Sequence, residues 1–159
     1  LQRVTEAPPA ARADLAKRWE ATTFDTEAIG KALCMARDHS AIQTVLHARE
    51  IPDIGAHIGR AMLGCAVQQR RPEAVADALP LMLDINEPLN TLWQDTALCG
   101  AAERSDARTL TLLLKAKADP ERPCRDGKPA RDRLAALAAQ KKPGASDALA
   151  AFDRQLEAK

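Results

Sequence analysis

Residues 95–120 read DTALCGAAERSDARTLTLLLKAKADP, and this stretch decides the fold. Small residues fill positions 97–102, where alanine favours helix formation and allows neighbouring helices to approach closely. Ser105 and Asp106 supply side-chain oxygens that cap a new helix, which we predict over residues 107–115. The stretch therefore predicts two short helices joined by a tight polar turn and followed by a polar connection.

Similar segments occur earlier in the chain. Residues 28–36 read AIGKALCMA and residues 57–66 read HIGRAMLGCA, so an Ile-Gly-(Lys/Arg)-Ala motif returns after 29 residues. Each segment precedes a polar break and a second apolar helix, predicted at 41–47 and at 72–79, and Pro72 suits the first position of a helix. A period of 30–35 residues predicts a stack of helix–turn–helix units.

The pattern within residues 95–120 resembles the ankyrin repeat. Thr96-Ala-Leu-Cys99 stands where that family has Thr-Pro-Leu-His, and Ala101-Ala102 matches its Ala-Ala pair. Leu112–Leu114 matches its leucine run, and Ala118-Asp119 matches its Ala-Asp before the hairpin. The resemblance implies that hairpins and first helices together line a binding face.

The match is uneven. Cys99 replaces the usual His, Ser105 replaces the turn Gly, and Lys117 replaces the Gly that ends the second helix, which removes a favoured left-handed cap. The unit around residues 84–86 resembles the family less, and the first and last units resemble it least. The resemblance extends over about residues 26–159.

We therefore predict an all-α protein, an ankyrin-like solenoid of about four helix–turn–helix repeats with an extra N-terminal helix. Apolar residues make up 46% of the chain and aromatic residues only 3%, so Ala and Leu dominate and a sheet lacks its preferred residues. A stack of another all-α family, such as an armadillo-like one, is the alternative. The predicted parts are a lead-in at 1–12, a helix from 13 to 19 that carries Trp19, and repeats at about 26–54, 55–90, 91–126 and 127–159.

The balance of charge argues against nucleic acid and membranes as partners. The chain has 23 basic and 22 acidic residues, and this balance gives no general attraction to nucleic acid or to a membrane. Residues 115–142 hold nine basic and four acidic residues, which we interpret as a polar end cap rather than a nucleic-acid site.

Because the chain begins with Leu1, we expect a processed product or part of a longer protein. We predict a bacterial source and a cytoplasmic location.

The chain contains four cysteines. Cys34, Cys65 and Cys99 are separated by 31 and 34 residues, close to one repeat, so we predict small, buried, reduced residues in successive helices. Neighbouring helix axes lie ~8–10 Å apart, beyond the ~7 Å Cα separation that a disulfide tolerates. Cys124 is predicted in an exposed hairpin between Arg122 and Arg125, where it is the one candidate reactive thiol.

Nothing else in the sequence indicates catalysis. His39, His47 and His57 lack a recognisable relay, and no glycine-rich phosphate loop or paired-cysteine metal motif is present. Gly59 and Gly64 are predicted to allow close helix packing. We therefore predict no catalytic residue, no cofactor and no metal.

We predict a protein-interaction module that binds another protein, with a regulatory or immunity-type subunit that inhibits one cognate enzyme or toxin as the alternative. Trp93 either anchors a partner or folds back over Leu89 and Leu92. We expect no small-molecule substrate, and neither a membrane nor nucleic acid as a partner. The predicted partner-binding residues are Trp93, Gln94, Glu103, Arg104, Arg122 and Arg125.

Overall fold

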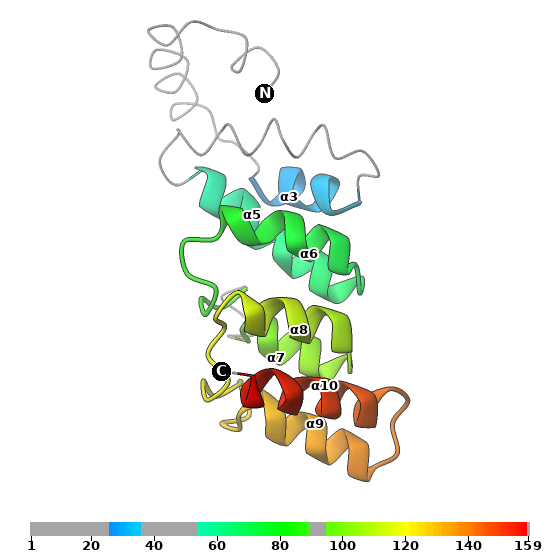
Figure 1. Cartoon of the computed structure of the whole chain (residues 1–159). Coiled ribbons are helices and arrows are strands. Elements are labelled where there is room, and N and C mark those ends of the chain that lie inside the picture. Colours follow the sequence, from blue (N-terminus) through cyan, green and yellow to red (C-terminus); the bar gives the residue numbers. More distant parts are fainter. Residues whose placement is uncertain (1–25, 36–53, 90–94, 159) are drawn as a thin grey trace, which may run out of the picture.

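The computed structural model describes residues 26–35, 54–89 and 95–158, and these parts of the chain are helical (Figure 1). They contain no β-strand, only an isolated bridge between Pro123 and Pro129. The all-α prediction is therefore confirmed. The elements are α3 (Thr26–Met35), α5 (Ile54–Gln68), α6 (Pro72–Ala78), the short 3₁₀ helix η2 (Leu79–Leu81), α7 (Ala97–Glu103), α8 (Ala107–Lys115), α9 (Ala130–Ala139) and α10 (Ala145–Glu157).

The helices form two layers of a stack. Helices α5 and α6, α7 and α8, and α9 and α10 pack as consecutive pairs. The first helices of the pairs also contact one another in the order α3, α5, α7, α9, while α6, α8 and α10 form the second layer. The predicted helices at 13–19 and 41–47 lie outside the described residues.

Local signals explain where the helices begin. The Thr96 hydroxyl accepts a hydrogen bond from the Cys99 amide at 3.3 Å, and the Asp106 carboxylate accepts one from the Thr109 amide at 3.2 Å. Both bonds satisfy amides that have no partner within the first helical turn. Pro72 occupies the start of α6, as predicted.

The turns that end the helices repeat along the stack. Arg70, Ser105 and Lys141 all have a positive φ, and they are 35 and 36 residues apart. At each of them two backbone hydrogen bonds close the end of the helix; at the middle turn, the amides of Ser105 and Asp106 donate to carbonyls of α7. Lys117 adopts the same conformation, with a φ of 67°, at the end of α8. The expectation that this cap is lost is therefore wrong, because lysine takes the left-handed position that glycine favours.

Apolar side chains fill the space between the layers. Leu63, Leu113 and Phe152 are fully buried and come from different helix pairs, so the core is continuous along the stack. Gly59 allows η2 to approach α5, since a β-carbon there would lie 2.6 Å from the Leu81 β-carbon. A β-carbon at Gly64 would meet only the Leu89 β-carbon, at an ordinary 3.9 Å. The packing prediction is confirmed for Gly59 and wrong for Gly64.

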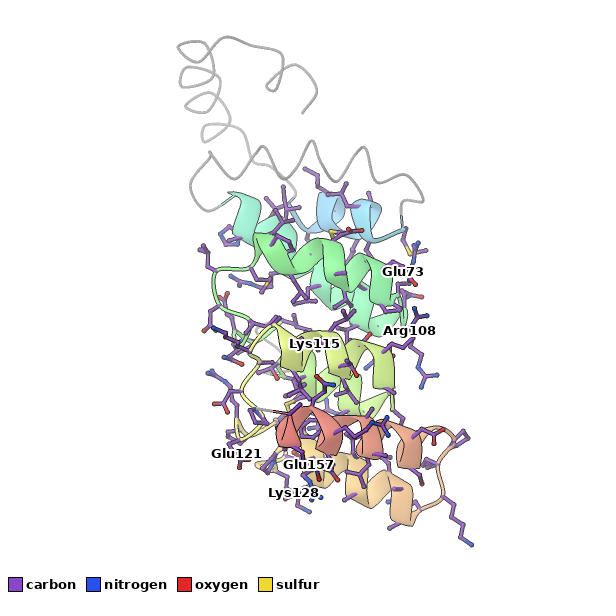
Figure 2. The ribbon with its side chains drawn as sticks, viewed as in Figure 1. Glu73, Arg108, Lys115, Glu121, Lys128 and Glu157 are labelled. Carbon is purple, nitrogen blue, oxygen red and sulfur yellow. A yellow bond between two sulfur atoms is a disulfide. The ribbon has the colours of Figure 1, made fainter. Side chains whose placement is uncertain are left out.

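Arginines join neighbouring units at the turn edge of the stack. The Arg71 guanidinium donates to the Cys34 carbonyl oxygen at 2.6 Å, and the Arg104 Nε donates to the Gln68 carbonyl oxygen at 3.4 Å. The last carbonyls of a helix have no hydrogen-bond partner within that helix. Each arginine therefore caps the end of the first helix of the preceding unit. On the second layer, Glu73 of α6 and Arg108 of α8 form a more exposed pair with 3.8 Å between the charged atoms (Figure 2).

Candidate functional site

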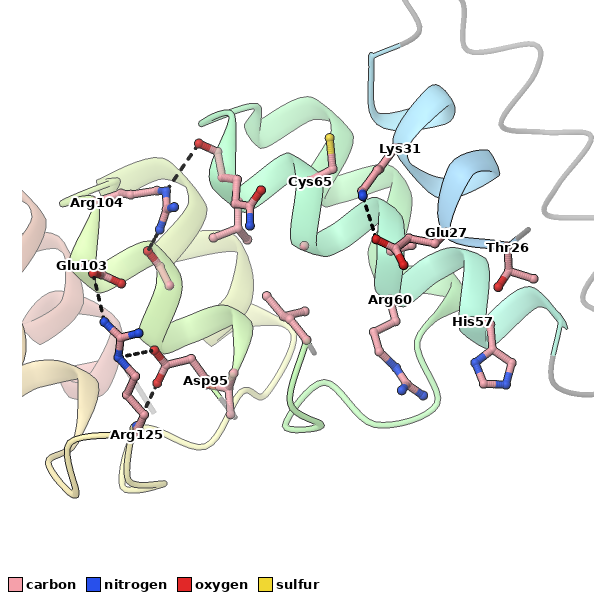
Figure 3. Close-up of a pocket in the computed structure, with 17 residues that line it drawn as sticks. Thr26, Glu27, Lys31, His57, Arg60, Cys65, Asp95, Glu103, Arg104 and Arg125 are labelled. Atoms are coloured by element: carbon pink, nitrogen blue, oxygen red, sulfur yellow. Dashed lines mark hydrogen bonds and ion pairs between the residues drawn. The ribbon is translucent and has the colours of Figure 1, made fainter. Parts of the chain in front are cut away.

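A groove of about 620 Å³ crosses the first-helix layer. Helices α3, α5 and α7 supply its floor and walls, and the segments that precede α7 and α9 close one side (Figure 3). Its lining is rich in charged residues, which come from three helices and two connecting segments: Glu27 and Lys31 from α3, Arg60 from α5, Glu103 and Arg104 from α7, Asp95 from the segment before α7 and Arg125 from the segment before α9.

Arg125 links the hairpin to α7 inside this groove. Its backbone amide donates to Asp95 Oδ1 at 2.8 Å, its Nε lies 3.7 Å from Asp95 Oδ2, and its Nη2 lies 3.7 Å from Glu103 Oε1. The hairpin is itself closed by a hydrogen bond from the Cys124 amide to the Lys128 carbonyl oxygen at 2.9 Å. The position of the Arg125 guanidinium is therefore set by both backbone and side-chain contacts.

A less exposed ion pair supports this arrangement. Arg133 Nη1 lies 3.3 Å from Asp95 Oδ2, and both side chains are only 12% exposed. Arg133 Nη2 also lies 3.2 Å from Asp126 Oδ1. Burial lowers the pKa of Arg133, but its hydrogen bonds to Asp126 and Asp95 outweigh burial and hold that pKa above its ordinary value. The hydrogen bond from Arg133 is the main cause that lowers the pKa of Asp126.

The groove continues toward α9. A second hollow of about 270 Å³ shares Glu103 and Arg125 with the first, and Arg133, Ala136 and Leu137 form its far side. One surface therefore runs over α3, α5, α7 and α9.

Two further arginines face the main groove. The Arg104 Nη1 donates to the Gly100 carbonyl oxygen at 3.3 Å, so within the described residues the hydrogen bonds of Arg104 go to backbone oxygens rather than to carboxylates. Arg60 pairs with Glu87 at 2.7 Å, while its Nε is buried and has no hydrogen-bond partner in the described part of the chain.

The structure brings together half of the predicted partner-binding set. Glu103, Arg104 and Arg125 line the same groove. Arg122 is exposed but does not line it, and Trp93 and Gln94 lie outside the described residues. The charged groove residues of α3 and α5 were not predicted, because no local pattern marks a lone Lys31 or Arg60 as the neighbour of a hairpin far along the chain.

The prediction of reduced, stacked cysteines is wrong. Cys34 is bonded to Cys65 and Cys99 to Cys124, with Cα separations of 6.1 and 5.7 Å. Cys124 is also 5% exposed, so it is neither an exposed nor a reactive thiol. The first pair forms because Gly30 brings α3 against α5 more closely than average helices pack; a β-carbon at Gly30 would lie 2.6 Å from that of Ala61.

Cys65 and Cys99 do not occupy equivalent positions in their repeats, although their spacing is close to the repeat period. Cys65 lies five residues before Arg70, whereas Cys99 lies six residues before the equivalent Ser105. One residue rotates a side chain by about 100° around a helix. Cys65 therefore faces α3 and the groove, while Cys99 faces the hairpin that carries Cys124.

One cluster has the composition of a metal site. A carboxylate oxygen of Asp95 and the sulfurs of Cys99 and Cys124 lie within 4.8 Å of one another. The sulfurs are disulfide-bonded rather than thiolate, and the Asp95 carboxylate already pairs with Arg125 and Arg133. Two guanidinium groups disfavour an added cation, so we assign no metal to this cluster.

Comparison with known proteins adds no relative. A scan against protein-family models gives no match, and searches of curated proteins and of solved structures give no significant match. The helices described are also too short or too polar for any of them to cross a membrane.

Proposed function

We propose that this chain is an ankyrin-like solenoid that binds a partner protein along its first-helix groove. The observation that carries the proposal is the continuity of the groove, because consecutive units α3, α5, α7 and α9 each contribute to it. A surface assembled from successive repeats suits an extended protein contact. The turns at Arg70, Ser105 and Lys141 support the repeat assignment, because they recur at the spacing of the units.

The chemistry of the lining also favours a protein as the ligand. The groove carries Lys31, Arg60, Arg104 and Arg125 against Glu27, Asp95 and Glu103, so the two signs nearly balance. A polyanion such as nucleic acid would select a strongly basic surface instead. Mixed charges around an interface steer association and discriminate among protein partners, and arginine is enriched at the centres of such interfaces.

The alternative, an inhibitory or immunity-type subunit, is favoured by the rigidity of the same face. Two disulfides and the pairs of Asp95 with Arg125 and Arg133 hold the groove in one shape. Preorganisation lowers the entropy lost on binding and therefore increases affinity for one cognate partner. This alternative predicts tight, one-to-one binding that abolishes the partner's activity.

We further propose that the protein works in an oxidising compartment rather than in the predicted cytoplasm. All four cysteines are paired. Such disulfides persist mainly in secreted and periplasmic proteins, because cytosolic reductants keep thiols reduced.

A matched pair of charge reversals tests the binding face. A photo-crosslinking residue at Gln68, an exposed position on the groove, identifies the partner in native extract, and the purified partner then gives dissociation constants. Glu103→Arg should raise the dissociation constant at least tenfold, on the order of 1.4 kcal/mol. Glu73→Arg is the control, because Glu73 also pairs with an arginine, at 3.8 Å against 3.7 Å for Glu103, but lies on the second layer.

The outcome separates the proposals. An equal effect of the two reversals, or no effect of either, removes the groove as the binding face. Loss of the partner's enzymatic or toxic activity on mixing would select the inhibitory subunit over the general interaction module.

A further inference from the structure

The two disulfides differ in access. Cys99 and Cys124 are 1% and 5% exposed, so their bond is enclosed in the core. Cys34 is fully buried, but its partner Cys65 is only half-buried and lines the groove (Figure 3). Of the two disulfides, Cys34–Cys65 is therefore the one with a cysteine on an open surface, while Cys99–Cys124 is shielded.

The Cys34–Cys65 bond also holds one wall of the groove. Helix α3 contributes Glu27 and Lys31 to the lining, and these two residues pair with each other at 2.6 Å. The helix buries few large apolar side chains of its own: Leu33 is 7% exposed and Ile29 is partly buried. A disulfide that spans 31 residues restricts the open chain and favours the closed state by roughly 500-fold. The cross-link therefore adds to the packing of α3 on α5, which also includes the close approach at Gly30 and the Arg71 hydrogen bond to the Cys34 carbonyl oxygen.

The rest of the stack has contacts of its own that do not involve this bond. Helices α5 to α10 share a core that includes Leu63, Leu113 and Phe152, and the Cys99–Cys124 disulfide joins α7 to the hairpin before α9. Opening Cys34–Cys65 changes the groove wall and leaves the floor in place.

We propose that the Cys34–Cys65 disulfide is a redox gate that controls whether the groove has its α3 wall; the proposal rests on the proposed function of that groove. A dithiol reductant supplies the two electrons. Its thiolate attacks the Cys65 sulfur and forms a mixed disulfide, and Cys34 leaves as a thiolate that takes up a proton. The second thiol of the reductant then displaces Cys65, which is protonated in turn, and the reductant ends as a disulfide.

Graded reduction tests the order of opening. The oxidised protein is treated with increasing dithiothreitol and alkylated, and each cysteine is quantified by mass spectrometry. We expect Cys34 and Cys65 to be alkylated before Cys99 and Cys124. Simultaneous alkylation of all four, or earlier alkylation of Cys99 and Cys124, overturns the proposal.

Amide hydrogen exchange tests what opening does. In the Cys34→Ala/Cys65→Ala variant, residues 26–35 should exchange at least tenfold faster, while α7 to α10 keep wild-type protection. In the matched variant Cys99→Ala/Cys124→Ala, residues 26–35 should keep their protection. Unchanged exchange over residues 26–35 in the first variant overturns the proposal. Loss of protection throughout the chain also overturns it, because the bond would then stabilise the whole fold rather than α3 alone.

A binding measurement distinguishes failure of the gate from failure of the proposed function. If the wild type binds the crosslinked partner and Cys34→Ala/Cys65→Ala binds it at least tenfold more weakly, the gate is supported. Equal binding by both overturns the gate and leaves the proposed function standing. Absence of any groove-dependent binding by the oxidised wild type overturns both proposals.

Discussion

Lys117 ends α8 with a φ of 67°, a left-handed conformation in which an L-residue is roughly 1–2 kcal/mol less stable than in the right-handed region. Two hydrogen bonds hold it there. The Lys117 amide donates to the Leu114 carbonyl oxygen at 3.1 Å, and the Ala118 amide donates to that of Leu113 at 3.0 Å. The bonds satisfy carbonyls at the helix end, so the turn persists despite the side chain.

Replacing this lysine by glycine should therefore stabilise the protein. We expect Lys117→Gly to raise the free energy of unfolding by about 1 kcal/mol, because glycine removes the steric conflict of its β-carbon. Lys115→Gly is the matched control; Lys115 is also exposed but lies in the last turn of α8, where glycine is less favourable by about 1 kcal/mol. Guanidinium denaturation measures both, and a loss of stability in Lys117→Gly would contradict the cap.

The groove shows how far single residues could be predicted. Glu103, Arg104 and Arg125 were predicted from the repeat pattern, which indicates the positions of first helices and hairpins. Asp95 was recognised only as the start of the best repeat, although it pairs with both Arg125 and Arg133. These pairs join residues 30 and 38 positions apart, and no local signal in the sequence specifies such a contact.

At the scale of elements, two glycines of α5 have different surroundings. A β-carbon at Gly59 would lie 2.6 Å from the Leu81 β-carbon and 3.2 Å from the Leu81 backbone carbon, so η2 would have to move. At Gly64 the nearest atom would be 3.9 Å away, which is an ordinary contact. Both glycines lie inside the same helix, so they share the intrinsic preference of helices for alanine.

Replacing glycine by alanine should therefore have opposite effects on stability at these two positions. We expect Gly59→Ala to lower the free energy of unfolding by about 2 kcal/mol, because the cost of overpacking exceeds the gain in helix propensity. Gly64→Ala should raise it by about 0.5–1 kcal/mol, since propensity acts alone there. Thermal unfolding followed by circular dichroism compares the two variants. Equal effects of the same sign would mean that α5 and η2 are not packed this closely.

The cysteines show why some elements were predicted better than others. Residues 107–115 were predicted as a helix with the bounds that α8 has, because its cap and its apolar pattern are local. The disulfides were missed because an average axis spacing was applied to a pair of helices that glycine brings closer, and because Cys124 lies in a hairpin. Helix distances depend on contacts between units, which the period does not reveal.

For the molecule as a whole, neighbouring units are joined by a small set of specific bonds. The Arg71 guanidinium caps Cys34 of the preceding unit, and the Asn86 side chain accepts from the Asp119 amide at 2.8 Å. In a linear stack each unit contacts only its neighbours, so total stability depends on these junctions as well as on the shared core. The all-α class and the pairing of short helices followed from composition and period, whereas the ankyrin assignment stays a prediction.

The Cys99–Cys124 bond, which spans 25 residues, joins α7 to the hairpin before α9. Cross-linking a loop of this size restricts the unfolded chain and stabilises the folded state by roughly 3–4 kcal/mol. Cys99→Ala/Cys124→Ala should therefore lower the free energy of unfolding in guanidinium by about that amount.

Alanine is preferred to serine because a hydroxyl at these buried sites would add its own desolvation cost. Fully reduced wild type, which keeps the cysteine side chains, supplies the control for lost packing and should fall at least as far, since it also lacks Cys34–Cys65. A loss below about 1 kcal/mol in the alanine variant would mean that the Asp95, Arg125 and Arg133 contacts hold this junction without the disulfide.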